Sequence, residues 1–238
     1  MSITLLKTLT AAGYGARRIV AQAVKDGRVS FNGQTAVSFS QVVTPTDTIL
    51  FDGKPVKPLN EKPIYLLLNK PAGVLSTTYD ARGRQTVIDL VPAKYRSSDL
   101  HLVGRLDLAS RGLILLTTDG ELTHLLTHPR YEKEKEYLVT LSHALILADR
   151  ISFEQGIELE DGITFPTRVV DVSSKPPAYC ITLHEGRKRQ IRRMFQSLGY
   201  QVRDLKRTRL GNLRLGTLQE GTVRELSADE VRGLGKVR

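Results

Sequence analysis

One aspartate stands at a position where a carboxylate could do chemistry. Asp107 ends the string Gly104-Arg105-Leu106-Asp107 and lies in a turn between two strand-like segments, residues 101–103 and the apolar run 113–116. A carboxylate in such a turn either shapes the turn or acts as a catalyst. Carboxylates catalyse as nucleophiles or by moving protons. Arg105, two residues earlier, would place a cation near any substrate held there.

A second candidate region is strongly basic. Residues 184–214 contain ten Lys or Arg and only two acidic residues, so they hold most of the net charge of +10. Within 186–195, Ile191 and Phe195 have helical spacing and would face a core, while arginines cover the other faces. A solvated helix surface is the alternative interpretation. Because the excess is concentrated in one segment, we favour a polyanionic partner, and nucleic acid first.

Motifs for metal or cofactor chemistry do not stand out. The five histidines are scattered without metal-ligand spacing, and the single cysteine, Cys180, lies in a strand-like segment typical of a packing residue. The chain has no Gly-x-Gly-x-x-Gly after a strand and no Walker sequence. We therefore expect neither a metal nor a cofactor.

Two strings resemble motifs of one enzyme family. The segment 104–120, with Asp107 followed by Ser110-Arg111-Gly112, resembles the catalytic motif of the RsuA/RluB family of ribosomal RNA pseudouridine synthases. The segment 184–194 resembles a second motif of that family. The resemblance implies an enzyme that breaks the N-glycosidic bond of a uridine, turns the base and rejoins it through carbon. Such an isomerase needs no cofactor, but the target base must leave its helix.

The resemblance also implies roles for individual residues. Asp107 would be the catalyst, as a nucleophile or as a base that removes a sugar proton, and Arg192 would pair with it and keep it ionised. Tyr137, which follows Lys-Glu at the start of a strand, would stack on the target base, although a tyrosine packed in a sheet is a common alternative. The expected substrate contacts are Arg105, Arg187, Gln190 and Ile191. The string from Lys70 to Gly73 resembles a further family element.

Two other functions fit parts of the pattern. A catalytically silent RNA-binding ribosome assembly factor could keep the fold, but an intact Asp107 argues against it. A hydrolase would combine Asp107 with a second carboxylate such as Asp119, because glycoside hydrolysis usually needs two. Asp119 precedes a predicted helix at 121–126, so a capping role explains it better.

Residues 1–54 predict a small separate domain. The pattern from Ala16-Arg17-Arg18 to Asn32-Gly33 resembles the alpha-L RNA-binding motif, first known from a small-subunit ribosomal protein. The expected RNA contacts of the whole chain are Arg17, Arg18, Lys25, Arg28, Arg189 and Arg193. Residues 55–62, rich in proline, predict a linker, and 63–238 would form the pseudouridine synthase domain.

The element pattern predicts an α+β fold with a mixed, largely antiparallel sheet. Expected strands are 29–31, 48–51, 64–69, 137–140, 167–170 and 179–183, with helices at 16–25, 145–153, 189–198 and 228–234. With a pI near 9.8, no signal peptide and no apolar stretch long enough for a bilayer, we expect a cytoplasmic protein, monomeric and off the membrane. Its expected partner is ribosomal RNA, free or in an assembling subunit, and the string at 187–194 resembles the large-subunit branch of the family more closely.

Overall fold

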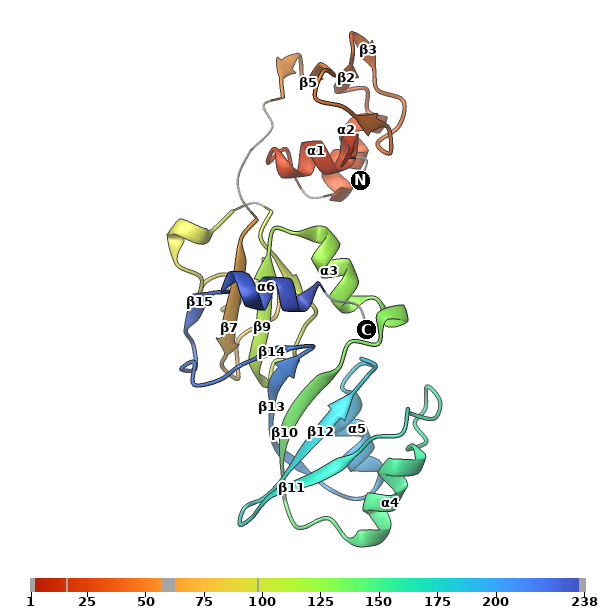
Figure 1. The fold of residues 1–238 in the computed structure, drawn as a ribbon, viewed down its shortest axis with the longest axis vertical. Helices are drawn as coiled ribbons and strands as arrows, with labels where there is room; N and C mark the ends of the chain where they lie inside the picture. Colours follow the sequence, from red (N-terminus) through yellow and green to blue (C-terminus); the bar gives the residue numbers. More distant parts are fainter. Residues whose placement is uncertain (1–2, 16, 57–62, 98, 236–238) are drawn as a thin grey trace. The chain divides into compact units, whose positions relative to one another are not determined.

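The chain folds into two compact units, residues 1–63 with 96–100 and residues 64–95 with 101–238 (Figure 1). The structure is a computed structural model that describes residues 3–15, 17–56, 63–97 and 99–235. No helix among these residues is long and apolar enough to cross a membrane.

The first unit joins two short helices to small antiparallel sheets. Its elements are β1 (Ile3–Thr4), α1 (Leu5–Ala11), α2 (Arg17–Lys25), β2 (Val29–Phe31), β3 (Gln34–Thr35), β4 (Val42–Val43), β5 (Ile49–Phe51) and β6 (Lys54–Pro55). The Thr4 hydroxyl caps α1 by accepting from the Lys7 N–H at 3.3 Å. Asn32 and Gly33 both have positive φ, as the predicted two-residue hairpin turn requires. The predicted helix start at Ala16 lies outside the described residues.

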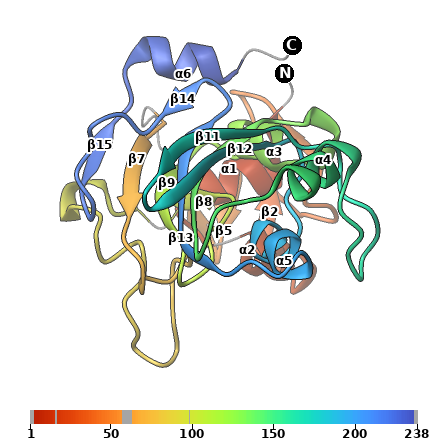
Figure 2. The same ribbon diagram turned by 90° about the horizontal axis from the view of Figure 1, so that it is seen from below.

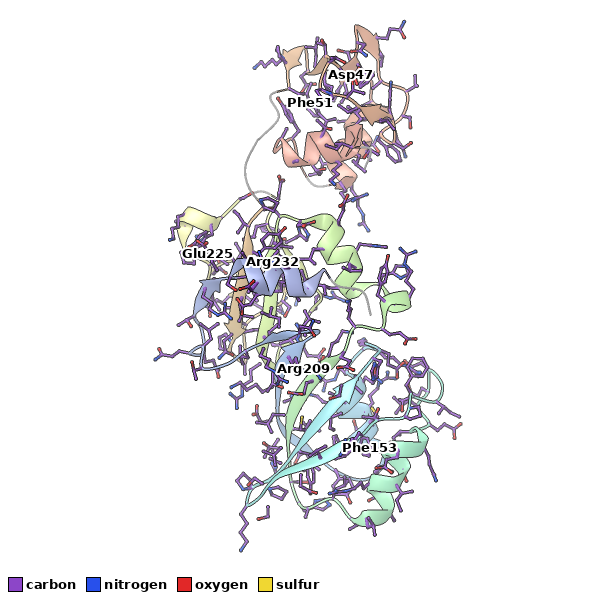
Figure 3. All side chains as sticks on the ribbon, in the orientation of Figure 1. Asp47, Phe51, Phe153, Arg209, Glu225 and Arg232 are labelled. Atoms are coloured by element: carbon purple, nitrogen blue, oxygen red, sulfur yellow. The ribbon has the colours of Figure 1, made fainter. Side chains whose placement is uncertain are left out.

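The first unit extends beyond the predicted boundary at residue 54. β6 pairs with β5 as an edge strand, where the missing N–H of Pro55 costs no ladder hydrogen bond. Val56 then donates its N–H to Ile49 and packs on the core that contains Phe51 (Figure 3). The predicted linker therefore cannot start at 55, and residues 57–62 lie outside the described residues.

The second unit is built on one large sheet. Its elements are β7 (Tyr65–Lys70), η1 (Ala93–Tyr95), β8 (His101–Val103), β9 (Arg111–Thr117), α3 (Gly120–Thr127), η2 (Pro129–Tyr131), β10 (Lys135–Leu141), α4 (Leu147–Gln155), β11 (Val169–Ser174), β12 (Pro177–Leu183), α5 (Gln190–Ser197), β13 (Val202–Leu210), β14 (Leu213–Arg214), β15 (Val223–Glu225) and α6 (Ala228–Leu234). The strand order is β11-β12-β10-β13-β9-β7-β15, with β8 on β9 and β14 on β13. Only β13 and β9 pair in parallel among the named strands of this sheet. The predicted α+β fold with a largely antiparallel sheet is confirmed.

Two hydrophobic clusters fix the helices on this sheet. Phe153 of α4 and Phe195 of α5 pack at 4.8 Å between ring centroids, beside the end of the sheet formed by β10 to β13 (Figures 2 and 3). α3 and α6 pack on alternate side chains of β7 and β9, and the intervening side chains of these strands are also buried. The apolar runs in β7 and β9 are therefore explained by burial on both faces.

The predictions differ most from the structure at β13. This nine-residue strand occupies a central place in the sheet, but its sequence is mostly charged and no strand was predicted there. Its charges are tolerated because β10 and β9 flank it and supply partners: Arg209 pairs with Glu136, and Asp204 with Arg111. Helix α4 starts at Leu147, not 145, because the backbone of Ile146 is extended (φ −80°, ψ 158°) and forms the N-cap.

Candidate active site

One row of residues crosses the middle of the sheet and carries much of the candidate site. Following the register from β12 to β7, it runs through Ile181, Tyr137, Arg207, Gly112 and Lys70. Residues directly opposite each other on neighbouring strands point to the same face. The pairing therefore brings side chains from three distant parts of the chain together.

Gly112 makes this row possible. A Cβ at this residue would lie 2.3 Å from the carbonyl oxygen of Arg207 and 2.7 Å from its nitrogen. Its φ of +105° is also a conformation that side-chain-bearing residues rarely adopt. Gly112 thus allows β9 and β13 to approach directly after the turn that holds Asp107.

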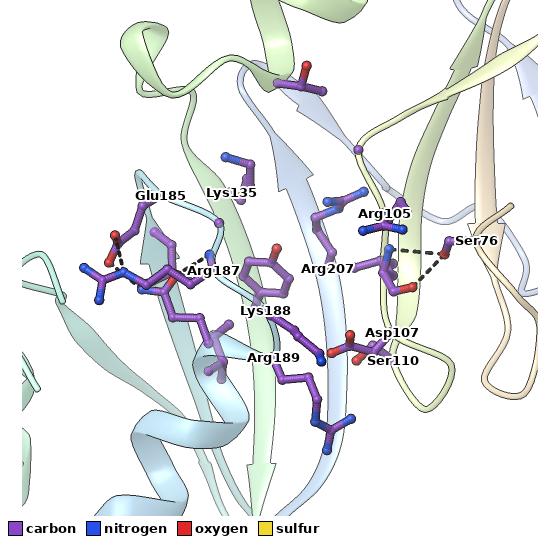
Figure 4. A pocket seen from close by; sticks show the side chains of 18 of the residues that line it. Ser76, Arg105, Asp107, Ser110, Lys135, Glu185, Arg187, Lys188, Arg189 and Arg207 are labelled. Atoms are coloured by element: carbon purple, nitrogen blue, oxygen red, sulfur yellow. Dashed lines mark hydrogen bonds and ion pairs between the residues drawn. The ribbon is translucent and has the colours of Figure 1, made fainter. Parts of the chain in front are cut away.

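A cleft of about 1060 Å³ opens over this row (Figure 4). Its basic lining residues are Arg84, Arg105, Lys133, Lys135, Arg187, Lys188, Arg189 and Arg207. Its acidic lining residues are Asp80, Asp107, Glu132 and Glu185. Tyr137 and Ile191 also line it. The excess of cations suits a polyanionic substrate.

Asp107 is the half-buried carboxylate of the cleft whose oxygens stay free. Asp80 is bonded to Arg84, Glu185 accepts from Arg187 and Gln190, and Glu132 is exposed. Across the described residues, the Asp107 carboxylate takes part in no hydrogen bond or ion pair. In Figure 4, Lys188 extends from the opposite wall toward it.

Two side chains, Ser76 and Lys70, hold the backbone around Asp107. The Ser76 hydroxyl donates to the Leu106 carbonyl at 2.7 Å and accepts the Leu106 N–H at 3.1 Å (Figure 4). Lys70 Nζ donates to the carbonyls of Leu108 at 3.3 Å and Ser110 at 2.6 Å, and more weakly to that of Asp107 at 3.4 Å. A turn bonded at so many carbonyls keeps its carboxylate in one place.

Lys70 is a fully buried cation. The sequence did not predict its burial and indicated only that the turn beginning at Lys70 resembles a family element. Burial lowers the pKa of its ammonium to about 8, and the charge of Asp107 partly offsets that shift. The sequence signal was a lysine ending an apolar strand directly before a proline.

Arg192 approaches Asp107 but does not pair with it. Its Nη1 donates to the Val202 carbonyl and its Nη2 to the Ala109 carbonyl, each at 3.1 Å. No ion pair joins Arg192 to Asp107 in the described chain, contrary to the predicted contact. Burial is the main cause that lowers the pKa of the Arg192 guanidinium. The nearby negative charge of Asp107 acts in the opposite direction and raises that pKa. Arg192 therefore bonds the turn that carries the carboxylate.

Arg187 and Gln190 line the cleft but use most of their hydrogen-bond donors within the protein. Arg187 donates from Nε to Glu185 at 2.9 Å, and its two terminal nitrogens reach the carbonyls of Asp161, Gly162 and Ile163. Gln190, 4% exposed, donates to Glu185 at 2.6 Å and accepts the Arg187 N–H at 3.0 Å. These two residues, predicted to contact substrate, organise the wall of the cleft, because their donors are already used.

The other predicted residues divide between the cleft and its surroundings. Arg105 and Arg189 line the cleft with exposed side chains, and Ile191 lines it from the core. Arg193 lies outside the cleft lining and forms a two-bond ion pair with Asp161 at 2.9 Å.

Arg207 and Lys135 are among the cleft cations that sequence reasoning missed. Arg207 is 2% exposed and lies opposite Tyr137 in the register, while Lys135 begins β10 two residues before Tyr137. Both lay in strings already noted, Lys135 before the tyrosine and Arg207 in the basic segment. Without the strand β13, nothing in the sequence indicated that they share a face.

The candidate RNA contacts of the first unit differ in their partners. Arg17, Arg18 and Lys25 of α2 are exposed, and within the described residues none of them forms an ion pair. Arg28 instead donates to Asp52 from Nε at 2.8 Å, and its guanidinium lies 5.1 Å from the centre of the Phe51 ring. The charge of Arg28 is thus already paired with a carboxylate of the protein.

Asp119 has the capping role that its sequence predicted. Its Oδ1 accepts the N–H groups of Glu121 and Leu122, each at 3.0 Å, and its Oδ2 accepts the Tyr65 hydroxyl at 2.8 Å. It does not line the cleft of Asp107. The described residues also hold no cluster of three His, Cys, Asp or Glu suited to a metal ion.

Comparison with known proteins points to one family. Residues 64–197 match the RNA pseudouridylate synthase family. The ribosomal large subunit pseudouridine synthase B of Bacillus subtilis (strain 168) is 37% identical over 97% of this chain and 94% of its own length. The ribosomal small subunit pseudouridine synthase A of Yersinia pestis is 37% identical over 83% of each chain. A solved crystal structure of a pseudouridylate synthase, 31% identical, superposes with a TM-score of 0.70 over 98% of this chain and 100% of the other.

Proposed function

The chain belongs to the RNA pseudouridylate synthase family and is an isomerase, and we propose that its substrate is a single uridine of ribosomal RNA, in the large rather than the small subunit. Relatives named for each subunit support ribosomal RNA as the substrate class. The preference for the large subunit rests on the resemblance of the string 187–194 to the large-subunit branch of the family. The cytoplasm, where ribosomal RNA is available in bacteria, is the proposed place of action.

The free carboxylate of Asp107 carries the proposal. The carboxylate either bonds to C1′ of the ribose as the N-glycosidic bond breaks, or removes a proton from the sugar. Either step requires an ionised, unengaged carboxylate held at a fixed point. Its surroundings fit this requirement: bonded turn carbonyls on both sides, and Arg192 and Lys70 as nearby positive charges.

Tyr137 is the proposed stacking partner of the flipped uracil. It is half-buried, lines the cleft and packs its other side on the core. Base–aromatic stacking contributes about 1–3 kcal/mol per base, which offsets part of the cost of unstacking the uridine from its helix. Exposed Arg105, two residues before Asp107, would contact the RNA strand as the base leaves it.

The first unit is proposed as an RNA docking domain of the alpha-L type. Three exposed cations along α2, Arg17, Arg18 and Lys25, support this role, since they form no ion pair with any residue that the structure describes. Their spacing over one short helix suits the phosphates of a folded RNA helix, which proteins read mostly by shape. The unit would then deliver the target to the cleft of the second.

The test is to map pseudouridines in ribosomal RNA from cells lacking this gene and complemented with wild type, Asp107→Asn or Asp119→Asn. We expect one large-subunit site to vanish, and only wild type and Asp119→Asn to restore it, because Asn also caps helices. Restoration by Asp107→Asn would remove the catalytic assignment. If no pseudouridine vanished from the cells lacking the gene although the purified protein bound ribosomal RNA, the silent assembly factor would be favoured.

A further inference from the structure

Two cations of the cleft, Arg207 and Lys135, are not paired with a carboxylate in the described part of the chain. Arg207 is 2% exposed, donates from Nε to the Leu113 carbonyl at 2.8 Å, and its Nη2 is buried without a partner. Lys135 is half-buried and donates only to the Lys133 carbonyl at 3.0 Å. In the described residues, neither forms an ion pair. A buried guanidinium nitrogen without an acceptor is costly, so it points to a ligand.

The sheet aims both groups at the same space. Arg207 lies opposite Tyr137 on β13, and Lys135 lies two residues before Tyr137 on β10, so all three point to one face. Both cations line the cleft of Asp107, and in Figure 4 their side chains extend to the same side of neighbouring strands.

The two cations also repel each other. Burial, and then the charge of Arg207, lower the pKa of the Lys135 ammonium to about 8. A lone neutral acceptor, such as a uracil carbonyl, could bond one of these groups but would not relieve the repulsion. An anion would do both, because it attracts each cation and accepts several hydrogen bonds.

We propose that Arg207 and Lys135 form a subsite of the cleft that binds one backbone phosphate of the RNA strand carrying the flipped uridine. The identity of the ligand as RNA rests on the proposed function. The phosphate would lie beside the ring of Tyr137, so that backbone and base are held together. The pair would thus fix the register of the strand relative to Asp107.

The experiment measures binding of full-length protein to a fluorescent single-stranded oligouridylate at several salt concentrations. Each phosphate neutralised by the protein adds about 0.7 to the slope of log affinity against log salt for single strands. We expect Arg207→Gln and Lys135→Gln each to weaken binding about tenfold. Each should also lower the salt slope by at most about 0.7, whereas Lys135→Arg should keep the wild-type slope. Arg203→Gln is the matched control, because Arg203 is an exposed cation on the same strand outside the cleft.

Two results would overturn the subsite. Weaker binding with an unchanged salt slope would mean that a neutral group, such as the base, meets these cations. An equal loss in Arg203→Gln would mean diffuse attraction to a basic surface. Arg207→Gln removes a bond between β13 and β9 and could unfold the protein, in which case Lys135→Gln decides alone. Because binding is read without turnover, failure of the proposed isomerisation would not alter either slope.

Discussion

The chain has two clusters of basic residues that look alike in sequence and are used differently. On α2, Arg17, Arg18 and Lys25 are exposed and, in the described part of the chain, form no ion pair. In the segment 187–193, by contrast, Arg187, Arg192 and Arg193 all bond to carbonyls or carboxylates of the protein.

The difference follows from what lies opposite each cluster. Among the described residues, no carboxylate or carbonyl bonds to the side chains of Arg17, Arg18 or Lys25, so their charges remain available. The segment 187–193 leads into helix α5. There, carbonyl oxygens of the loop 161–163 and of the turn 107–110 accept hydrogen bonds from its arginines. Charge density therefore indicates a nucleic-acid protein, but it does not tell which cations touch the nucleic acid.

Replacement of Arg192 should have the largest effect on the reaction. Arg192→Met removes the bond to the Ala109 carbonyl, so the turn that carries Asp107 loses one of its three supports. We expect kcat to fall about 100-fold, since small displacements of a catalytic group cost that much, with KM nearly unchanged. Arg192→Lys should recover part of kcat. A rise in KM at constant kcat would instead make Arg192 a substrate contact.

Replacement of Arg187 should reduce stability more than any other change within the cluster. Arg187→Met removes one of the donors to Glu185 and the donor to the carbonyls of residues 161–163, and we expect a loss of about 2–3 kcal/mol in denaturant unfolding. Arg193→Met is the control, because its pair with half-exposed Asp161 should contribute less than about 1 kcal/mol. Equal losses would erase the distinction between these two arginines.

The buried Lys70 should make stability depend on alkaline pH. Its pKa is lowered from 10.5 to about 8 in the folded protein, so between these values the unfolded chain binds more protons. The cost of burying the charge is full below pH 8 and disappears as pH rises toward 10.5. Lys70 therefore raises the free energy of unfolding with pH, by at most about 1.4 kcal/mol per unit.

The variant Lys70→Met should flatten this rise in urea unfolding measured at pH 8, 9 and 10. Part of the slope should remain, because Lys135 is shifted in the same direction. An unchanged slope in Lys70→Met would show that Lys70 keeps an ordinary pKa.

Single replacements on α2 should have the smallest effects. Arg17→Gln, Arg18→Gln or Lys25→Gln should each weaken binding to ribosomal RNA about two- to fivefold and reduce its salt dependence, with stability within about 0.5 kcal/mol of wild type. Arg28→Gln should instead lower stability slightly, because Arg28 is paired with Asp52. If Arg28→Gln alone weakened RNA binding, the contrast between paired and unpaired cations would fail.

Local sequence was a reliable guide wherever local physics decides. The Asn32-Gly33 hairpin, the Asp119 cap and the helix 228–234 are confirmed by the structure. Each depends on the backbone preferences or hydrogen bonds of a few neighbouring residues. Strand β13 escaped prediction because its charged residues are balanced by Glu136 and Arg111, which are distant in sequence.

The sequence by itself determined the α+β fold, the enzyme family and the turn that presents Asp107, because these depend on contiguous motifs and on periodicity. Only the tertiary structure decided which charged side chains are paired within the protein. The register of β10, β13, β9 and β7 brings Tyr137, Arg207 and Lys70 to one face, and Gly112 permits that approach. The physical reason is that a cation is paired or unpaired according to its neighbours in space. Strand pairing determines those neighbours, and spacing along the chain does not.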